Sequence, residues 1–180
     1  LNGKWLVAGE NVHKFESQFS KKFGVKYSHM VNSGSSANLV LIAGLKKYFK
    51  WEDGDEIIVS PVGFPTTIST LVQNNLVPVY IDIEYDTLNF DLSQIESKIT
   101  TKTKGIFVSP VLGNPPDMDR LKEICDKHHL KLIGDSCDSI GTKWDGKDIN
   151  EYYVAWSTSF YPAHHITTGE GGMISTNIEE

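Results

Sequence analysis

The chain has little of several features that mark other classes of protein. It contains only two cysteines, Cys125 and Cys137, and their spacing fits no zinc or haem motif and is too sparse for a disulfide scaffold. No apolar run is long enough to span a bilayer, and no signal peptide opens the chain. These absences predict a cytoplasmic protein whose two thiols are reduced.

An excess of positive charge is also lacking. The chain has 17 lysines and arginines against 23 aspartates and glutamates, which gives a formal net charge of −6. This balance argues against nucleic acid or an anionic membrane as the main partner. It does not exclude a local site for a phosphorylated ligand.

A third absence is local, because no lysine occurs in the segment 159–172, which reads SFYPAHHITTGEGG. An imidazole moves protons near neutral pH, but it cannot form the covalent bond that a lysine amine makes with an aldehyde. We therefore regard His164 as a candidate acid–base residue. Adjacent residues of an extended segment point in opposite directions, so we expect His165 to pack rather than to share a metal ion with His164.

Short apolar strands alternate with amphipathic helical patterns along the 180 residues. This alternation predicts a three-layer α/β/α fold with a mostly parallel sheet, in which ligands bind beyond the carboxyl ends of the strands. The expected helices cover 12–23, 33–47, 66–73, 92–99 and 117–128. The expected strands cover 27–31, 57–59, 77–81, 105–108, 130–133, 154–157 and 172–175, and the strand at 130–133 runs into Asp135.

The first candidate binding element is the segment 32–37, NSGSSA, between an expected strand and an expected helix. Small residues such as Gly34 and Ser35 let the backbone approach a ligand closely, and the free N–H groups of a helix start favour a phosphate. The alternative is an ordinary helix cap that is rich in small residues.

Two further candidates follow expected strands. Asp135 stands at the end of a buried strand, where a carboxylate could pair with a protonated ring nitrogen; the alternative is an exposed turn aspartate. Phe64 lies between Gly63 and Pro65 and could stack on a flat ligand; the alternative is a residue of the core. Ser159, five residues before His164, could donate its hydroxyl to a phosphate.

Taken in this order, the motifs resemble the DegT/DnrJ/StrS family of pyridoxal-phosphate (PLP)-dependent sugar-nucleotide enzymes, which have the aspartate-aminotransferase-like fold (fold type I). The resemblance covers nearly the whole chain. It implies that residues 1–180 are a truncated large cofactor-binding domain, and that a small C-terminal domain is absent from this chain. The segments that carry it are 9–16, 32–37, 113–119, 135, 169–173 and 176–177.

The resemblance also implies roles for individual residues. Gly34, Ser35 and Ser159 would bind the cofactor phosphate, Phe64 would stack on the pyridine ring, and Asp135 would pair with the pyridine nitrogen.

Two further positions concern the reaction. Asp138 stands where family members place a polar residue close to the ring, and His164 occupies the position of the cofactor-binding lysine. Most members carry that lysine and are aminotransferases.

A minority have paired histidines there, and this chain is most similar to the CDP-sugar dehydrases among them. The resemblance thus implies a lyase, a 3-dehydratase of a 4-keto-6-deoxy sugar nucleotide that works with pyridoxamine 5′-phosphate (PMP). Such enzymes supply deoxysugars for lipopolysaccharide and O-antigen.

Three alternatives stay open at this point. The chain could belong to a sugar aminotransferase, to a non-catalytic relative that binds the cofactor, or to an aminotransferase whose lysine has been changed to histidine by engineering. The resemblance further implies a homodimer. In one dehydratase type a [2Fe–2S] cluster and a partner reductase take part, and the cluster cysteines would then lie beyond residue 180.

Overall fold

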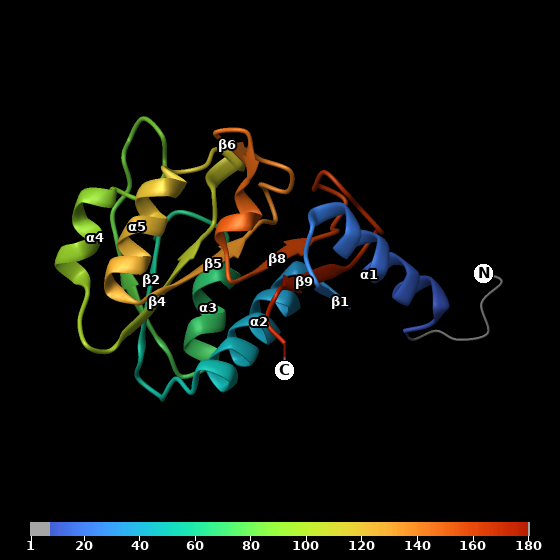
Figure 1. Cartoon of the computed structure of the whole chain (residues 1–180), viewed down its shortest axis with the longest axis horizontal. Coiled ribbons are helices and arrows are strands. Elements are labelled where there is room, and N and C mark those ends of the chain that lie inside the picture. The colour runs from blue at the N-terminus through green and yellow to red at the C-terminus, as the bar shows by residue number, and fades with distance from the viewer. Residues whose placement is uncertain (1–7, 180) are drawn as a thin grey trace.

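A seven-stranded sheet crosses the computed structural model, which describes residues 8–179 (Figure 1). The strands lie in the order β1-β9-β8-β5-β4-β2-β3. Their bounds are β1 Tyr27–Val31, β2 Glu56–Val59, β3 Val77–Tyr80, β4 Thr103–Val108, β5 Lys131–Asp135, β8 Ala155–Ser159 and β9 Gly172–Thr176.

The expected mostly parallel sheet is confirmed. Strands β3, β2, β4, β5 and β8 pair in parallel, whereas β9 pairs antiparallel with both β8 and β1. Two reversals restore the direction, so β1 runs the same way as β8. The carboxyl ends of six strands therefore meet at one edge of the sheet, and β9 begins at that edge.

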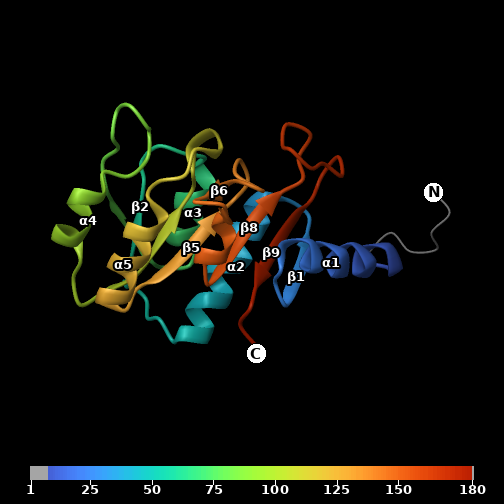
Figure 2. The ribbon, with the colours of Figure 1, turned by 45° about the horizontal axis from the view of Figure 1, so that its top comes forward.

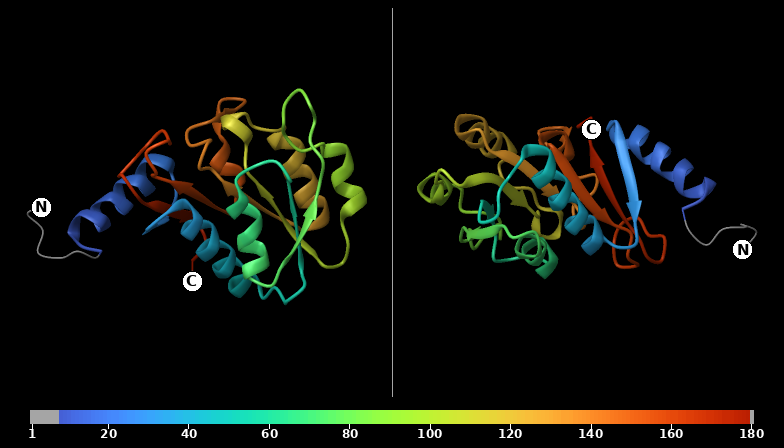
Figure 3. Two further views of the ribbon diagram at one scale, coloured as in Figure 1. Left: turned by 180° about the vertical axis from the view of Figure 1, so that it is seen from behind. Right: turned by 90° about the horizontal axis from the view of Figure 1, so that it is seen from below.

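Helices cover both faces of the sheet, as predicted. On one face lie α1 (Glu10–Phe23), α4 (Leu92–Lys98) and α5 (Met118–His128), and on the other lie α2 (Gly34–Phe49) and α3 (Pro65–Gln73), which Figure 3 shows in front of the strands when the molecule is seen from behind. None of the described helices has the length and apolar composition needed to cross a membrane.

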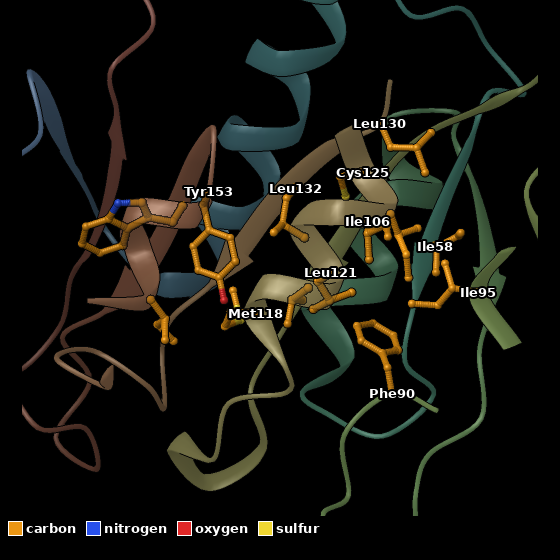
Figure 4. Close-up of a cluster of buried hydrophobic side chains, with 14 of the residues drawn as sticks. Ile58, Phe90, Ile95, Ile106, Met118, Leu121, Cys125, Leu130, Leu132 and Tyr153 are labelled. Atoms are coloured by element: carbon orange, nitrogen blue, oxygen red, sulfur yellow. The ribbon is translucent and has the colours of Figure 1, made fainter. Parts of the chain in front are cut away.

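Alternating strand side chains fill the two cores. Ile58, Ile106 and Leu132 pack under α4 and α5, and Figure 4 shows them beside Leu121. Their sequence neighbours Ile57, Phe107 and Ile133 pack under α2 and α3. This period of two is the pattern of a strand buried on both faces, and it explains why short apolar runs sufficed to predict the sheet.

The structure departs from the sequence-based expectation in short elements. A hairpin of β6 (Lys143–Trp144) and β7 (Lys147–Asp148) and two 3₁₀ turns, Val111–Gly113 and Ile149–Tyr152, were not predicted. Elements of two to four residues are too short to show a hydrophobic period. The strand expected at 154–157 lies at Ala155–Ser159, so Ser159 ends a strand.

Candidate active site

The predicted site residues gather at the edge where β1, β5 and β8 end. Gly172, the first residue of β9, is opposite both Val31 of β1 and Ser159 of β8. Asp135 of β5 is opposite Ser157 of β8. The loop from β8 to β9 extends beyond this edge (Figure 2), so the loops that carry the candidate residues share one side of the molecule.

The segment after β1 forms a capped helix start. Ser33 is the N-cap of α2, and its hydroxyl accepts a hydrogen bond from the Ser36 N–H at 3.1 Å. Gly34 and Ser35 are the first two residues of the helix, where backbone N–H groups lack partners within the helix. The cap is confirmed, and the free N–H groups and the helix dipole suit an anion at Gly34 and Ser35.

Gly34 lies against Ser159 at the end of β8. A β-carbon placed on Gly34 would be 2.6 Å from the β-carbon of Ser159 and 3.1 Å from its hydroxyl oxygen. Residue 34 must therefore be glycine for the helix start to approach the strand end. The structure brings together the two segments that the sequence assigns to a phosphate.

A second glycine holds the same loop in place and allows a test. A β-carbon on Gly172 would be 2.2 Å from the carbonyl oxygen of Ser33, whereas one on Gly44, in the exposed part of α2, would meet nothing within 4 Å. We expect Gly172→Ala to lower the free energy of unfolding by about 3 kcal/mol, because a backbone has to move.

We expect the matched variant Gly44→Ala to raise the free energy of unfolding by roughly 0.5–1 kcal/mol, since alanine favours the helix. Urea denaturation of both variants measures the difference. Equal stability of Gly172→Ala and the parent chain would show that the loop does not depend on this close approach.

Asp135 is buried, so the alternative interpretation, an exposed aspartate in a turn, is wrong. Its side chain is 2% exposed. One carboxylate oxygen accepts hydrogen bonds from the Asn38 amide at 2.8 Å and the Thr67 hydroxyl at 2.7 Å. The other accepts the backbone N–H of Cys137 at 3.3 Å.

These donors are all neutral, and among residues 8–179 no lysine, arginine or histidine forms an ion pair with Asp135. A buried carboxylate is costly unless it is paired with a cation. Neutral donors hold Asp135 in place and leave it suited to a positively charged ligand atom, such as a protonated ring nitrogen.

Sequence reasoning missed the residues that orient Asp135. Asn38 is 1% exposed and Thr67 is 3% exposed. The Asn38 amide oxygen in turn accepts the hydroxyl of Ser157 on β8. One signal was available, because Asn38 is the one amide on a buried helix face that is otherwise apolar or glycine. Nothing near Thr67 distinguished it from its neighbours.

Phe64 is not a core residue, so that alternative is also wrong. It precedes α3 as its N-cap residue, and it is 65% exposed. With Val59, Thr67 and Phe107 it borders a small hollow. Its ring is open to a flat ligand, and Thr67, one turn further on, connects this helix to Asp135.

His164 lies in the loop between β8 and β9, and the two adjacent histidines differ in environment. The side chain of His164 is 20% exposed, and its Nδ1 lies 3.2 Å from Oδ1 of Asp138. His165 is exposed. Phe160 braces the loop, since its N–H donates to Gly171 and its carbonyl accepts the N–H of Thr168. Residues 8–179 contain no group of three or more potential metal ligands placed to bind an ion.

Both cysteines are free thiols. Cys125 lies on the buried face of α5 and packs in the core, and burial raises its pKa to about 12. Burial and the neighbouring Asp135 carboxylate raise the pKa of Cys137 well above its usual range. A raised pKa keeps a thiol protonated, so neither cysteine is suited to act as a nucleophile or as a thiolate ligand.

Comparison with known proteins agrees with the sequence motifs. The profile of the DegT/DnrJ/EryC1/StrS aminotransferase family matches residues 1–180. The chain is 43% identical over 179 residues to dTDP-4-dehydro-2,6-dideoxy-D-glucose 3-dehydratase of Saccharopolyspora spinosa, covering 97% of this chain and 39% of that protein. It is 40% identical over 182 residues to GDP-4-keto-6-deoxy-D-mannose 3-dehydratase of Yersinia pseudotuberculosis, covering 100% of this chain and 46% of that protein.

A solved structure shows the same fold. Escherichia coli GDP-4-keto-6-deoxy-D-mannose-3-dehydratase with bound hydrated PLP superposes with a TM-score of 0.91 at 39% identity, covering 97% of this chain and 45% of that one. The chain thus spans less than half the length of these relatives. The aspartate-aminotransferase-like architecture expected from the sequence is confirmed.

Proposed function

This chain belongs to the DegT/DnrJ/EryC1/StrS aminotransferase family, and we propose that it is the cofactor-binding part of a 3-dehydratase of a 4-keto-6-deoxy sugar nucleotide. One observation carries the proposal: the loop between β8 and β9 presents His164 and no lysine at the edge where Asp135 is buried. The dehydratase names of the relatives at 43% and 40% identity support it.

We propose PMP, in exchange with PLP, as the cofactor. Gly34, Ser35 and Ser159 would hold its phosphate, because free N–H groups and hydroxyls converge there. Asp135 would face the ring nitrogen, and Phe64 would cover the ring. When bound, PMP supplies an amine that condenses with a keto group and a ring that accepts electrons.

The chain's own residues would then do two things. Asp135, held by Asn38 and Thr67, keeps the ring nitrogen protonated. His164 would take a proton from the methylene carbon of the cofactor and could return it to the C3 hydroxyl of the sugar, which would leave as water. Because no lysine is present in the loop, no internal amine competes for the cofactor.

The direct test supplies the full-length protein with PMP and a 4-keto-6-deoxyhexose linked to CDP, GDP or dTDP. We expect NMR spectra of the product to show loss of the C3 hydroxyl. The relatives reported above carry dTDP or GDP in their names, so the CDP preference predicted from the loop remains to be tested by this comparison. Binding of PMP without any turnover would point instead to a non-catalytic relative.

Aminotransferase activity is the second candidate, because the family is described by that activity. It predicts an amino group at C4 of the product and a protein–cofactor bond that borohydride makes permanent. Mass spectrometry of the borohydride-treated protein separates the two. We expect no covalent adduct, since a histidine cannot supply the amine.

We further propose a cytoplasmic homodimer that binds a sugar nucleotide. Cys125 lies in the core and Cys137 lies beside Asp135, so neither is placed to hold an iron–sulfur cluster. If a [2Fe–2S] cluster and a reductase complete the reaction, the cluster is ligated outside residues 1–180. Iron analysis of the full-length protein tests this.

Loss of the Thr67 hydroxyl is expected to weaken cofactor binding. Thr67→Val keeps the shape of the side chain and removes one of the two short hydrogen bonds to Asp135. We expect the Kd for PMP to rise about 5- to 30-fold, equivalent to roughly 1–2 kcal/mol for a hydrogen bond to a charged group. Fluorescence titration measures it, and Thr101→Val, in an exposed turn, is the control. An unchanged Kd in Thr67→Val would contradict this role.

A further inference from the structure

Asp138 and His164 meet although they belong to different loops. Asp138 lies in the turn after β5, His164 lies in the loop after β8, and the Asp138 Oδ1 atom is 3.2 Å from His164 Nδ1. The sequence-based reading placed Asp138 beside the ring of a ligand and gave it no relation to the histidine. The side chain of His164 is 20% exposed and that of Asp138 is 53% exposed, so the contact lies at the mouth of the site.

Backbone contacts hold the turn that carries Asp138. The N–H of Ser136 donates to the carbonyl of Ser157 on β8 at 2.8 Å, and the N–H of Ser139 donates back to Ser136 at 3.3 Å. Gly113 packs against the carbonyl oxygen of Asp138 so closely that an added β-carbon would lie 3.0 Å from it. The turn is therefore held on two sides, which sets the backbone position from which the Asp138 side chain extends toward His164.

The loop of His164 is held independently. The backbone N–H of His164 donates to the carbonyl of Tyr161 at 3.0 Å, and Phe160 links the two ends of the loop. Within residues 8–179, Nε2 of His164 has no hydrogen-bond partner. One ring nitrogen thus lies beside a carboxylate, and the other has no partner among the described residues.

A neutral imidazole carries a hydrogen on one nitrogen and a lone pair on the other, and a carboxylate can only accept a hydrogen bond. A carboxylate at Nδ1 stabilises the form that has its hydrogen there and leaves Nε2 as the acceptor. We propose that Asp138 is a positioning residue that holds His164 in the Nδ1–H form, so that Nε2 is the nitrogen that removes the proton.

The 3.2 Å separation is an ion-pair distance, and catalytic hydrogen bonds are commonly long or poorly aligned until the reactants bind. The inference rests on the proposed function in one respect, the identity of the proton that Nε2 removes. The tautomer itself is a property of the protein and can be measured without any substrate. The second oxygen of Asp138 stays available to the ring that the sequence predicts beside it.

The test uses two-bond proton–nitrogen NMR correlations of the full chain labelled with ¹⁵N in its histidines. The signals of His164 are assigned by their loss in His164→Asn. Above the pH at which the ring becomes neutral, we expect the parent protein to show the Nδ1–H form of His164. We expect Asp138→Ala to shift His164 toward the Nε2–H form and Asp138→Glu to restore the Nδ1–H form.

An exposed aspartate provides the matched control. Asp86 lies in the turn before α4 and, within the described residues, makes no side-chain hydrogen bond or ion pair, so Asp86→Ala should leave the His164 signals unchanged. The same variants are then compared for exchange of the PMP methylene proton, where we expect Asp138→Ala to be at least about tenfold slower than Asp86→Ala.

An unchanged tautomer in Asp138→Ala overturns the inference, whatever the enzyme does. Failure of the proposed function is recognised separately, by the absence of methylene exchange in the parent protein while its His164 signals still respond to Asp138→Ala. The response of the tautomer in that case supports the positioning role. Restoration by glutamate distinguishes a carboxylate effect from a general disturbance of the turn.

Discussion

Replacing His164 with asparagine is expected to stop the exchange of the PMP methylene proton with solvent when a 4-keto sugar nucleotide is bound. Asparagine is close to histidine in size and polarity, but it cannot accept a proton at neutral pH. We expect the dehydration rate to fall by about a thousandfold, within the range for loss of a general base. Deuterium incorporation followed by NMR or mass spectrometry measures the exchange.

The neighbouring histidine supplies the control. His165 is exposed, whereas His164 faces Asp138 at the edge of the sheet. We expect His165→Asn to stay within about twofold of the parent rate, because substitution of an exposed side chain that makes no hydrogen bond or ion pair within the described residues has little effect. Exchange at the parent rate in His164→Asn would remove this residue from the role of base, even if the protein proved to be a dehydratase.

Replacing Asp135 with asparagine is expected to cost nearly as much activity. A neutral amide cannot keep the ring nitrogen protonated, so the ring would lose its capacity to accept electrons. The carboxylate now accepts hydrogen bonds from the backbone N–H of Cys137 and from the side chains of Asn38 and Thr67. An amide would direct an N–H group at one of these donors. We expect a fall of about a thousandfold in rate and a loss of about 1–3 kcal/mol in stability.

A second buried aspartate separates these two effects. Asp55 is 8% exposed, accepts the Glu52 N–H at 2.9 Å, and lies near Lys104 at the opposite edge of the sheet. We expect Asp55→Asn to lower the free energy of unfolding but to leave the rate unchanged. Urea denaturation and the dehydration rate are measured on both variants. A rate in Asp135→Asn that falls no further than in Asp55→Asn would contradict the assignment of Asp135 to the ring nitrogen.

Much of the fold could be predicted because each long element has its own local pattern. The stripe of Phe15, Phe19 and Phe23 marks α1, and the apolar run at 57–59 marks β2. The small residues at 32–37 and the aspartate at a strand end likewise placed the candidate site at the edge where the carboxyl ends of the strands meet. Along each strand, alternate side chains then face the two layers of helices.

The remaining parts of the site depend on contacts between distant residues, which no local pattern contains. Asn38 and Thr67 reach Asp135 from 97 and 68 residues away. The burial of Asp135 and the exposure of Phe64 follow from how α2 and α3 pack, not from their own neighbours in the sequence. The contact between Asp138 and His164 joins two loops whose separation in space only the assembled sheet determines.

The single reversed strand has a consequence for how the protein folds. Among the strands of residues 8–179, β1 pairs only with β9, and its first residue, Tyr27, is opposite Thr176. Contacts of such wide sequence separation form slowly, because the entropy cost of closing a long loop precedes the stabilisation that the contacts provide. The segment 32–37, proposed to bind the phosphate, directly follows β1, and the loop that contains His164 directly precedes β9. Both therefore reach their places only when β1 pairs with β9. During synthesis on the ribosome, the cofactor pocket would therefore be among the last features of the domain to appear, after the parallel strands have already assembled.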